Sequence, residues 1–320
     1  MLFISPRELR KMGVLAMNRR NNEYIAPSNP RSRYPLVDDK LLTKRAAEAW
    51  GMAVPELCGV IESQFQVATL KERLSKLESF VIKPAQGSGG KGILVITRRD
   101  AELFYKPSGM PVTLADIERH ISNILSGLYS LGGRLDVAMI EKLVEFDDVF
   151  ADYSYEGVPD IRVIVYHGFP VMAMLRCSTH ASDGKANLHQ GAVGVGLDIG
   201  SGKALFAVQA NRRVHVHPDT GHDFKNLQVP YWHRILKLAA GCYDMTGLGY
   251  VGADVVLDKT LGPLILELNA RPGLAIQIAN RTGLLHRLRK IDELPPIPDV
   301  EERVATSIRL FAGQSGFEYD

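Results

Sequence analysis

The stretch GADVVLDKTLGPLILELNARPG, residues 252–273, contains two apolar runs separated by a short turn, a pattern that predicts two β-strands. Glu267 and Asn269 are two residues apart, so their side chains share one face of the second strand. If the strands pair as a hairpin, Asp254 can fall on the same face. Buried carboxylates are costly unless they are paired or bind a metal, and Mg²⁺ prefers such oxygen ligands. We therefore expect a Mg²⁺ site here, rather than strand-end residues on a solvated face.

A second segment, VIKPAQGSGGKG at residues 81–92, places Lys83 in an apolar strand directly before a glycine-rich turn. A buried lysine needs a negative partner. Glycine turns let the backbone approach a ligand closely and expose N–H groups that bind anions. The segment therefore favours a triphosphate-binding turn, although a glycine hairpin beside a structural Lys–Asp pair would look the same.

The composition is that of a globular protein. The 320 residues are 46% hydrophobic and 23% charged, with a formal net charge of +2. This length predicts about two domains. No apolar run reaches the roughly 18 residues of a membrane span, so none is expected, and the small net charge does not favour nucleic acid as a partner. Three widely spaced cysteines without a CxxC motif indicate a reducing compartment, and we expect a cytoplasmic protein.

Hydrophobic periodicity and turn residues predict the order of the elements. Helices are expected over 38–51, 113–131, 229–247 and 300–312, and strands over 79–84, 92–97, 138–144, 160–178 (two strands), 250–258 and 264–270. The glycine-rich segment 181–203 is expected to be a loop. Because strands, hairpins and helices are interleaved, the predicted fold class is α+β, or mixed α/β, rather than a simple parallel sheet.

The order of these motifs resembles the ATP-grasp superfamily and, within it, the alpha-L-glutamate ligase-like group, relatives of the ribosomal-protein glutamate ligase. Besides the stretch quoted first, the matching segments are DDKLLTKRAAEAWGMAVP (38–55), FVIKPAQGSGGKGI (80–93), MIEKLV (139–144), DIRVIV (160–165) and NLHQGA (187–192). The resemblance implies an ATP-grasp fold with the nucleotide between two lobes. It divides the chain into a basic N-terminal arm (1–37), a small lobe with the glycine-rich loop (38–143), a large lobe with the Mg²⁺ and substrate site (144–294) and a linker with a C-terminal helix (295–320).

The resemblance also implies the residues that bind ATP. Two lysines reach the phosphates, Lys83 and either Lys40 or Lys44. The glycine-rich loop covers the phosphates, the segment at 141–144 binds adenine largely through its backbone, and Asp147 or Asp148 contacts the ribose. The implied nucleotide-binding residues are Lys40, Lys83, Gly87, Ser88, Gly89, Gly90, Lys91, Glu141, Lys142, Val144 and Asp148.

The same resemblance implies the groups that act on the substrates. Asp254, Glu267 and Asn269 hold two Mg²⁺ ions, for which Mn²⁺ is an alternative. Arg162 and Asn187 contact the transferred phosphate, and Arg271 faces a carboxylate substrate. His189 orients a substrate or accepts a proton, and a purely structural role for it is equally open.

The implied activity is that of an ATP-dependent ligase that converts a carboxylate to an acyl phosphate and joins it to an amine. Glutamate or another amino acid would be added to a peptide or a small carboxylate, so the expected partners are ATP and these substrates. Two alternatives stay open, an ATP-grasp kinase or carboxylase without an amine acceptor, and a non-catalytic nucleotide-binding regulatory protein. A homo-oligomer is also compatible with the sequence.

The N-terminal region is expected to be abbreviated, since about 37 residues precede the first matching segment. Residues 1–45 contain ten Lys or Arg and four acidic residues. An arm this short does not form a core of its own, so we expect it to dock on the rest of the protein through Tyr24, Ile25 and Tyr34. Arg19 and Arg20 would then lie near the substrate entrance.

Overall fold

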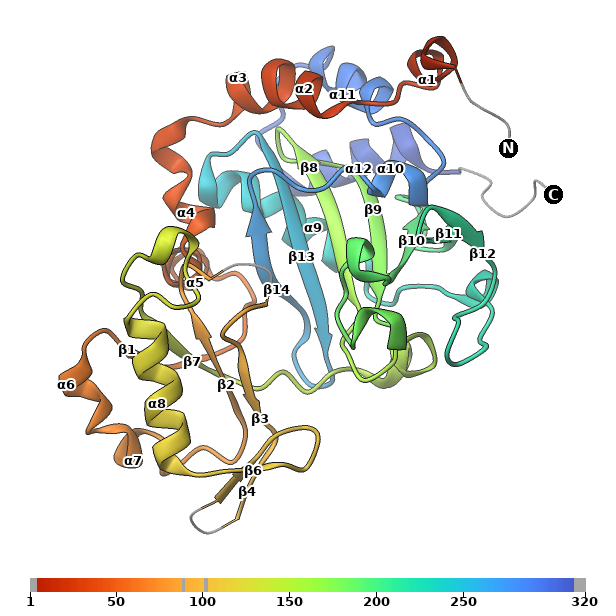
Figure 1. The fold of residues 1–320 in the computed structure, drawn as a ribbon. Helices are drawn as coiled ribbons and strands as arrows, with labels where there is room; N and C mark the ends of the chain where they lie inside the picture. Colours follow the sequence, from red (N-terminus) through yellow and green to blue (C-terminus); the bar gives the residue numbers. More distant parts are fainter. Residues whose placement is uncertain (1–4, 88–89, 101–102, 314–320) are drawn as a thin grey trace. The chain divides into compact units, whose positions relative to one another are not determined.

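The computed structural model describes residues 5–87, 90–100 and 103–313, which fall into two compact units (Figure 1). The first unit comprises three parts: the described residues up to Val37, residues 50–53, and the described residues from Phe146 onward. The second comprises residues 38–49 and the described part of 54–145. The domain boundaries expected at 37, 143 and 294 stay a prediction. Within the described residues, no helix combines the length and the apolar character of a membrane span.

The second unit is built on a four-stranded antiparallel sheet. In spatial order its strands are β1 (Leu57–Ile61), β7 (Ala138–Lys142), β2 (Phe80–Pro84) and β3 (Leu94–Ile96). Helix α8 (Leu114–Leu125) lies along this sheet (Figure 1) because Ile117, Ile121 and Ile124 recur at helical spacing and are fully buried against it. The remaining elements are α5 (Lys40–Ala49), α6 (Gln64–Val67), α7 (Leu70–Arg73), β4 (Arg98–Asp100), β5 (Leu103–Tyr105), β6 (Pro111–Val112) and η3 (Leu131–Gly133).

The first unit is built on a seven-stranded sheet in which all neighbouring strands are antiparallel. In spatial order the strands are β12 (Arg212–Val214), β11 (Ala204–Gln209), β10 (Val193–Leu197), β9 (Phe169–Cys177), β8 (Asp160–Tyr166), β13 (Tyr250–Asp258) and β14 (Gly262–Asn269). Helix α9 (Trp232–Thr246) packs against β8, β13 and β14, and α12 (Val300–Phe311) packs against α9 and β9. The predicted α+β class, with its helices and hairpins, is confirmed.

Shorter elements complete this unit. The short helix η4 (Asp148–Tyr153) precedes β8, and η5 (His180–Ser182) and η6 (Leu188–Gln190) lie between β9 and β10. The others are η7 (Phe224–Asn226), α10 (Ile276–Ala279) and α11 (Leu285–Asp292). Helix α10 packs on β9, β10 and β11.

The register of the sheet places charged residues of three strands next to one another. Asp254 of β13 lies opposite Glu267 of β14 on one side and opposite Arg162 of β8 on the other. Asp160 of β8 lies opposite Arg176 of β9. Because directly paired residues point to the same face of a sheet, the predicted hairpin does bring Asp254 and Glu267 to one face.

The expectation that residues 181–203 form a loop is wrong for 193–197, which form the buried strand β10 between β9 and β11. The glycines of this segment serve close packing instead of a turn. A Cβ atom at Gly196 would lie 2.2 Å from the carbonyl oxygen of Ala279, and one at Gly194 would lie 2.7 Å from Leu188. These glycines therefore allow α10 and η6 to pack closely against β10.

We expect Gly196→Ala to destabilise the protein by about 1–3 kcal/mol, because the added methyl overlaps backbone atoms that cannot move aside. Urea denaturation measures the loss. Gly273→Ala is the matched control, since a Cβ at Gly273 meets nothing within 4 Å, and its effect should stay within about 0.5 kcal/mol. Equal effects for the two variants would contradict the packing explanation.

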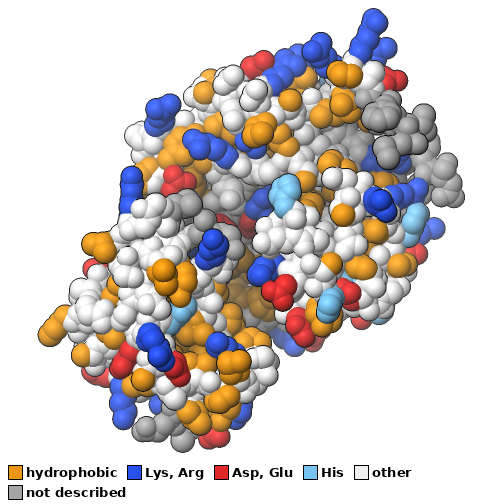
Figure 2. All heavy atoms as spheres, viewed as in Figure 1, with side chains coloured by type: hydrophobic (Ala, Val, Ile, Leu, Met, Phe, Trp, Pro, Cys, Tyr) orange, Lys and Arg blue, Asp and Glu red, His pale blue; other side chains and the backbone are white. Residues whose placement is uncertain are grey.

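The N-terminal segment packs on the rest of the first unit, with the expected anchors Tyr24 and Ile25 buried and Tyr34 only partly buried. It consists of α1 (Pro6–Lys11), α2 (Met17–Arg19), the π-helix η1 (Arg20–Ile25), α3 (Ala26–Ser28), η2 (Arg31–Arg33) and α4 (Pro35–Asp38). Tyr24 and Ile25 are 5% and 3% exposed, and the Asn29 side chain bonds to both the backbone N–H and the carbonyl of Tyr250 at 2.8 Å. Figure 2 shows Lys and Arg side chains over these helices, at the top of the view.

Candidate functional site

Two charged clusters contain most of the residues predicted to bind ATP and metal. The first lies in the second unit, where Glu141 of β7 sits between two lysines. The Nζ of Lys83, on the neighbouring strand β2, is 2.6 Å from Glu141 Oε2, and the Nζ of Lys44, on α5, is 2.8 Å from Oε1. All three side chains are at least nine-tenths buried. Lys44 also donates to the carbonyl of Pro55.

This Lys–Glu–Lys cluster has one more positive than negative charge. Burial alone would raise the pKa of Glu141, but the ammonium groups of Lys83 and Lys44 hold it below its usual value. Burial lowers the pKa of Lys44, and Glu141 opposes that shift. Two cations on one carboxylate leave a formal charge of +1, which suits an anion such as a phosphate.

Lys40 lies at the first residue of α5 and points to the glycine-rich loop. Its Nζ donates to the carbonyl of Gly87 at 2.7 Å, whereas Lys44 is committed to Glu141. Gly87 and Gly92 are required as glycines, since Cβ atoms there would lie 2.3 Å from Pro84 and 2.6 Å from Tyr129. Gly90 and Lys91 are exposed, and Ser88 and Gly89 lie outside the described residues.

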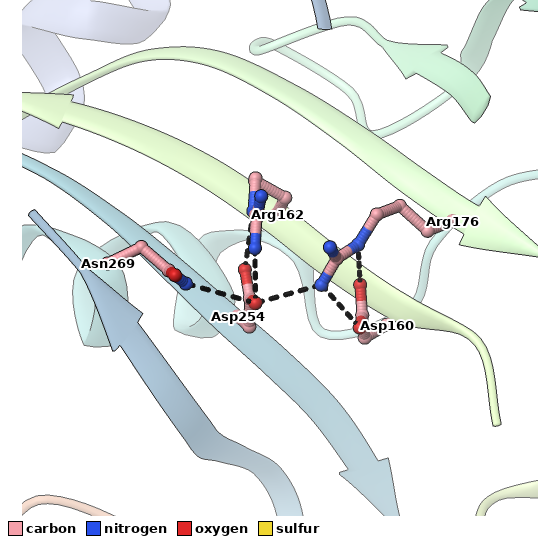
Figure 3. Close-up of polar contacts among 5 residues, drawn as sticks. All are labelled: Asp160, Arg162, Arg176, Asp254 and Asn269. Carbon is pink, nitrogen blue, oxygen red and sulfur yellow. Dashed lines mark hydrogen bonds and ion pairs between the residues drawn. The ribbon is translucent and has the colours of Figure 1, made fainter. Parts of the chain in front are cut away.

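The second cluster lies on the seven-stranded sheet and centres on Asp254 (Figure 3). Arg162 binds it with two parallel bonds, from Nε to Oδ1 at 2.7 Å and from one terminal nitrogen to Oδ2 at 2.6 Å. Arg176 donates to the same Oδ2 at 2.8 Å and also to both oxygens of Asp160, at 2.5 and 2.6 Å. The Asn269 amide donates to Asp254 Oδ2 at 3.3 Å.

Burial and charge act in opposite directions on the two acids of this cluster. Burial raises the pKa of Asp254, but Arg162 and Arg176 more than offset it, so the pKa lies below its usual value. For Asp160, burial and the nearby Asp254 outweigh Arg176 and raise the pKa to about 6. The guanidinium groups of Arg162 and Arg176 thus keep the Asp254 carboxylate ionised on this face of the sheet.

The residues predicted to hold Mg²⁺ supply the right oxygen donors, but Asp254 is largely occupied. Asp254 and Glu267 are opposite each other in the register, and the Asn269 side chain reaches Asp254. In the described part of the chain, no group of three His, Cys, Asp or Glu side chains is arranged to hold a metal ion. A metal site would therefore combine two carboxylates with an amide, and Asp254 would take part by releasing an arginine.

In the described part of the chain, the other predicted residues make their contacts with residues outside the Asp254 cluster. The Asn187 side chain accepts a bond from the backbone N–H of His189 at 3.0 Å, and His189 is exposed. The Arg271 guanidinium lies 5.3 Å from the centre of the Tyr34 ring. Asp148 pairs with Lys259 at 2.9 Å. Lys142 is exposed and Val144 is buried.

Sequence reasoning missed Asp160 and Arg176 and did not foresee that the Glu141 side chain would pair with lysines. The DIR segment contains Asp160 two residues before Arg162, which places both on one face of β8. An arginine inside the apolar run PVMAMLRCS was a further signal that a buried acid lies nearby.

Comparison with known proteins gives one family match and a set of solved structures that match most of the chain at low identity. A family model described as sugar-transfer associated ATP-grasp matches residues 19–293. Among curated protein sequences, none matches the chain.

Three solved structures illustrate the likeness. The ATP-grasp ligase PsnB complexed with a minimal precursor is 12% identical, with 88% of this chain and 63% of that chain covered and a TM-score of 0.47. A RimK domain ATP-grasp protein from Sphaerobacter thermophilus is 12% identical, with 82% and 70% covered and a TM-score of 0.46. The D-alanine-D-alanine ligase from Coxiella burnetii is 13% identical, with 87% and 60% covered and a TM-score of 0.48. The chain thus spans less than two thirds of the first and third of these proteins.

Proposed function

Because the chain belongs to the sugar-transfer associated ATP-grasp family, we propose that it is an ATP-dependent ligase that joins a carboxylate to an amine. The carboxylate oxygen would attack the γ-phosphorus of ATP, forming an acyl phosphate and releasing ADP. The amine nitrogen would then attack the acyl carbon, lose a proton and expel phosphate. An amino acid added to a peptide or to a small carboxylate is the substrate pair proposed.

The observation that carries the proposal is the convergence of Arg162 and Arg176 on Asp254, opposite Glu267. Phosphoryl transfer depends mainly on positioning and on neutralising the charge of phosphate oxygens. Guanidinium groups bind phosphate with parallel bonds of the kind that Arg162 makes with Asp254. We propose that Arg162 exchanges this carboxylate for the transferred phosphate.

The remaining roles follow from position and charge. Lys83 and Lys40 would bind the phosphates, and Lys44 would keep Glu141 neutralised when Lys83 turns to its ligand. The backbone of the glycine-rich loop would supply further donors. Glu267, Asn269 and Asp254 would hold Mg²⁺. Bound Mg²⁺ supplies positive charge to the phosphate oxygens and to the leaving group.

A screen for ADP release tests the ligase proposal. ATP and Mg²⁺ are supplied with peptides or small carboxylates, each with and without single amino acids as amines. Release of ADP and phosphate that requires both substrates supports ligation. ADP release with a carboxylate or with bicarbonate alone would instead indicate a kinase or carboxylase, and no release with any pair would favour a non-catalytic nucleotide-binding protein.

Lys83→Ala is expected to raise the Kd for ATP about 10–100-fold, because it removes one charge-assisted bond of about 1.5–3 kcal/mol. The fold should persist, since Glu141 keeps its contact with Lys44. Calorimetric titration with ATP measures the effect, and Lys76→Ala is the control because Lys76 is an exposed lysine of the same unit. Unchanged ATP affinity in Lys83→Ala would show that the phosphates bind elsewhere.

A further inference from the structure

Arg20 is a buried cation that no acidic side chain neutralises among the described residues. It is 6% exposed and begins the π-helix η1. Its Nε and one terminal nitrogen donate to Asn21 Oδ1 at 3.1 and 2.9 Å, and the other terminal nitrogen donates to the carbonyl of Pro272 at 2.6 Å. A guanidinium has five N–H donors, so two are left over after these three bonds. Buried charges are normally paired, and this one contacts only neutral acceptors.

The hydroxyl of Tyr250 is a second unsatisfied group beside Arg20. Tyr250 is fully buried, and its hydroxyl has no hydrogen-bond partner among the described residues. The two groups are close in the structure. The carbonyl of Pro272 accepts a bond from Arg20 at 2.6 Å, and Pro272 packs on Gly252, where an added Cβ would lie 2.6 Å from the proline ring. Gly252 is two residues from Tyr250 on β13 and shares its face. Burial raises the pKa of the Tyr250 hydroxyl, and the positive charge of Arg20 opposes the shift. Both backbone groups of Tyr250 are bonded to the Asn29 side chain, which fixes the strand at this residue.

A second guanidinium is carried by the residue directly before Pro272, whose carbonyl accepts the bond from Arg20. Burial lowers the pKa of Arg20, and the charge of Arg271 lowers it further. Arg271 is exposed, rests on the Tyr34 ring and has no acidic partner in the described part of the chain. Two like charges beside an unpaired hydroxyl would be unfavourable unless an anion joins them. A water molecule could satisfy the hydroxyl, but it would not neutralise the guanidinium groups.

Two features of the backbone support a binding role. A six-residue π-helix is rare, and such turns occur frequently at functional sites. Tyr250 and Asp254 are four residues apart on β13, so they share a face of the sheet at a distance of about 13 Å along the strand. A group held at Arg20 is therefore separate from one that reacts beside Arg162.

We propose that Arg20, Tyr250 and Arg271 form a binding site for a carboxylate that does not itself react, such as the free carboxylate of an amino acid or peptide substrate. Arg20 and Arg271 supply the charge, and the Tyr250 hydroxyl donates a hydrogen bond to a carboxylate oxygen. The choice of a substrate carboxylate rests on the proposed ligase function. The site itself rests on the unpaired groups in the first unit.

Thermal unfolding with sodium L-glutamate tests this site, with sodium chloride at equal ionic strength as the reference. Glutamate at about ten times its Kd should raise the Tm of the parent protein by about 3 °C. Arg20→Gln and Tyr250→Phe should lose most of this rise. Arg19→Gln is the matched control, because Arg19 is the neighbouring arginine, is only partly buried and already pairs with Glu23 at 2.7 Å, and it should keep the full rise.

Tyr250→Phe separates binding from folding. Without glutamate its Tm should equal or exceed that of the parent, since the variant removes a buried hydroxyl that lacks a partner. Three results would each overturn the proposal. The first is a glutamate effect that is undiminished in Tyr250→Phe, and the second is a glutamate effect in the parent no larger than that of chloride. The third is protection by sodium phosphate but not by glutamate. Protection by ATP with Mg²⁺, measured in the same variants, should persist in all of them. Its absence from the parent would count against the ligase function and not against the carboxylate site.

Discussion

An Asp254→Asn variant is expected to lower turnover about 10³-fold in the ADP-release assay, the size of effect seen when one electrostatic group of a reaction centre is removed. The amide keeps the shape of the side chain but loses the charge that Arg162 and Arg176 share. It is also a weaker ligand for Mg²⁺ than a carboxylate. Both the arginines and the proposed metal would then be misplaced at the transferred phosphate.

Asp258→Asn is the matched control for this prediction, because Asp258 is a buried aspartate at the C-terminal end of β13 whose carboxylate holds the turn at Thr260 and Leu261. Its turnover should stay close to that of the parent. Similar losses in the two variants would mean that Asp254 acts only through the stability of the strand, and unchanged turnover in Asp254→Asn would remove it from the reaction centre.

The second large effect is expected from Glu141→Gln, which should destabilise the protein by about 3–5 kcal/mol. The variant leaves Lys44 and Lys83, 6% and 9% exposed, without a counter-charge in the interior of the second unit. Urea denaturation measures the loss. Adding Lys44→Met should recover part of it, since one of the two unpaired charges is removed.

Glu62→Gln gives the reference value for a surface pair. Glu62 is 55% exposed and lies 3.9 Å from Arg45, so its loss should change stability by less than about 0.5 kcal/mol. A cost below about 1 kcal/mol for Glu141→Gln would show that the two lysines are not held as buried cations.

The strands and helices that were predicted correctly are those whose hydrophobic pattern can be read from the local sequence. The runs 250–258 and 264–270 are largely apolar, the first contains three valines, and they form β13 and β14. The ATP-grasp prediction is confirmed by the family match over residues 19–293. β10 was missed because Gly194 and Gly196 are typical of loops, and only the neighbouring Leu188 and Ala279 explain why glycine is needed there.

The sites were predicted less completely, because their contacts depend on which strands become neighbours. Asp254 and Glu267 could be placed together, since a hairpin pairs nearby segments. Arg176 reaches Asp254 from a strand 78 residues earlier in the chain, a pairing that no local pattern contains. Likewise, Lys44 meets Glu141 only after α5 packs on the sheet, so the choice between Lys40 and Lys44 as the lysine nearer the glycine-rich loop could not be made from sequence.

The most direct test of the proposed ligase reaction is the transfer of oxygen from the carboxylate to phosphate. The carboxylate that gives amine-dependent ADP release is labelled with ¹⁸O, and the inorganic phosphate formed is analysed by mass spectrometry. An acyl phosphate passes one carboxylate oxygen to phosphate, so we expect one ¹⁸O in each phosphate released with ADP. Unlabelled phosphate, or ¹⁸O found in AMP, would contradict the proposed reaction.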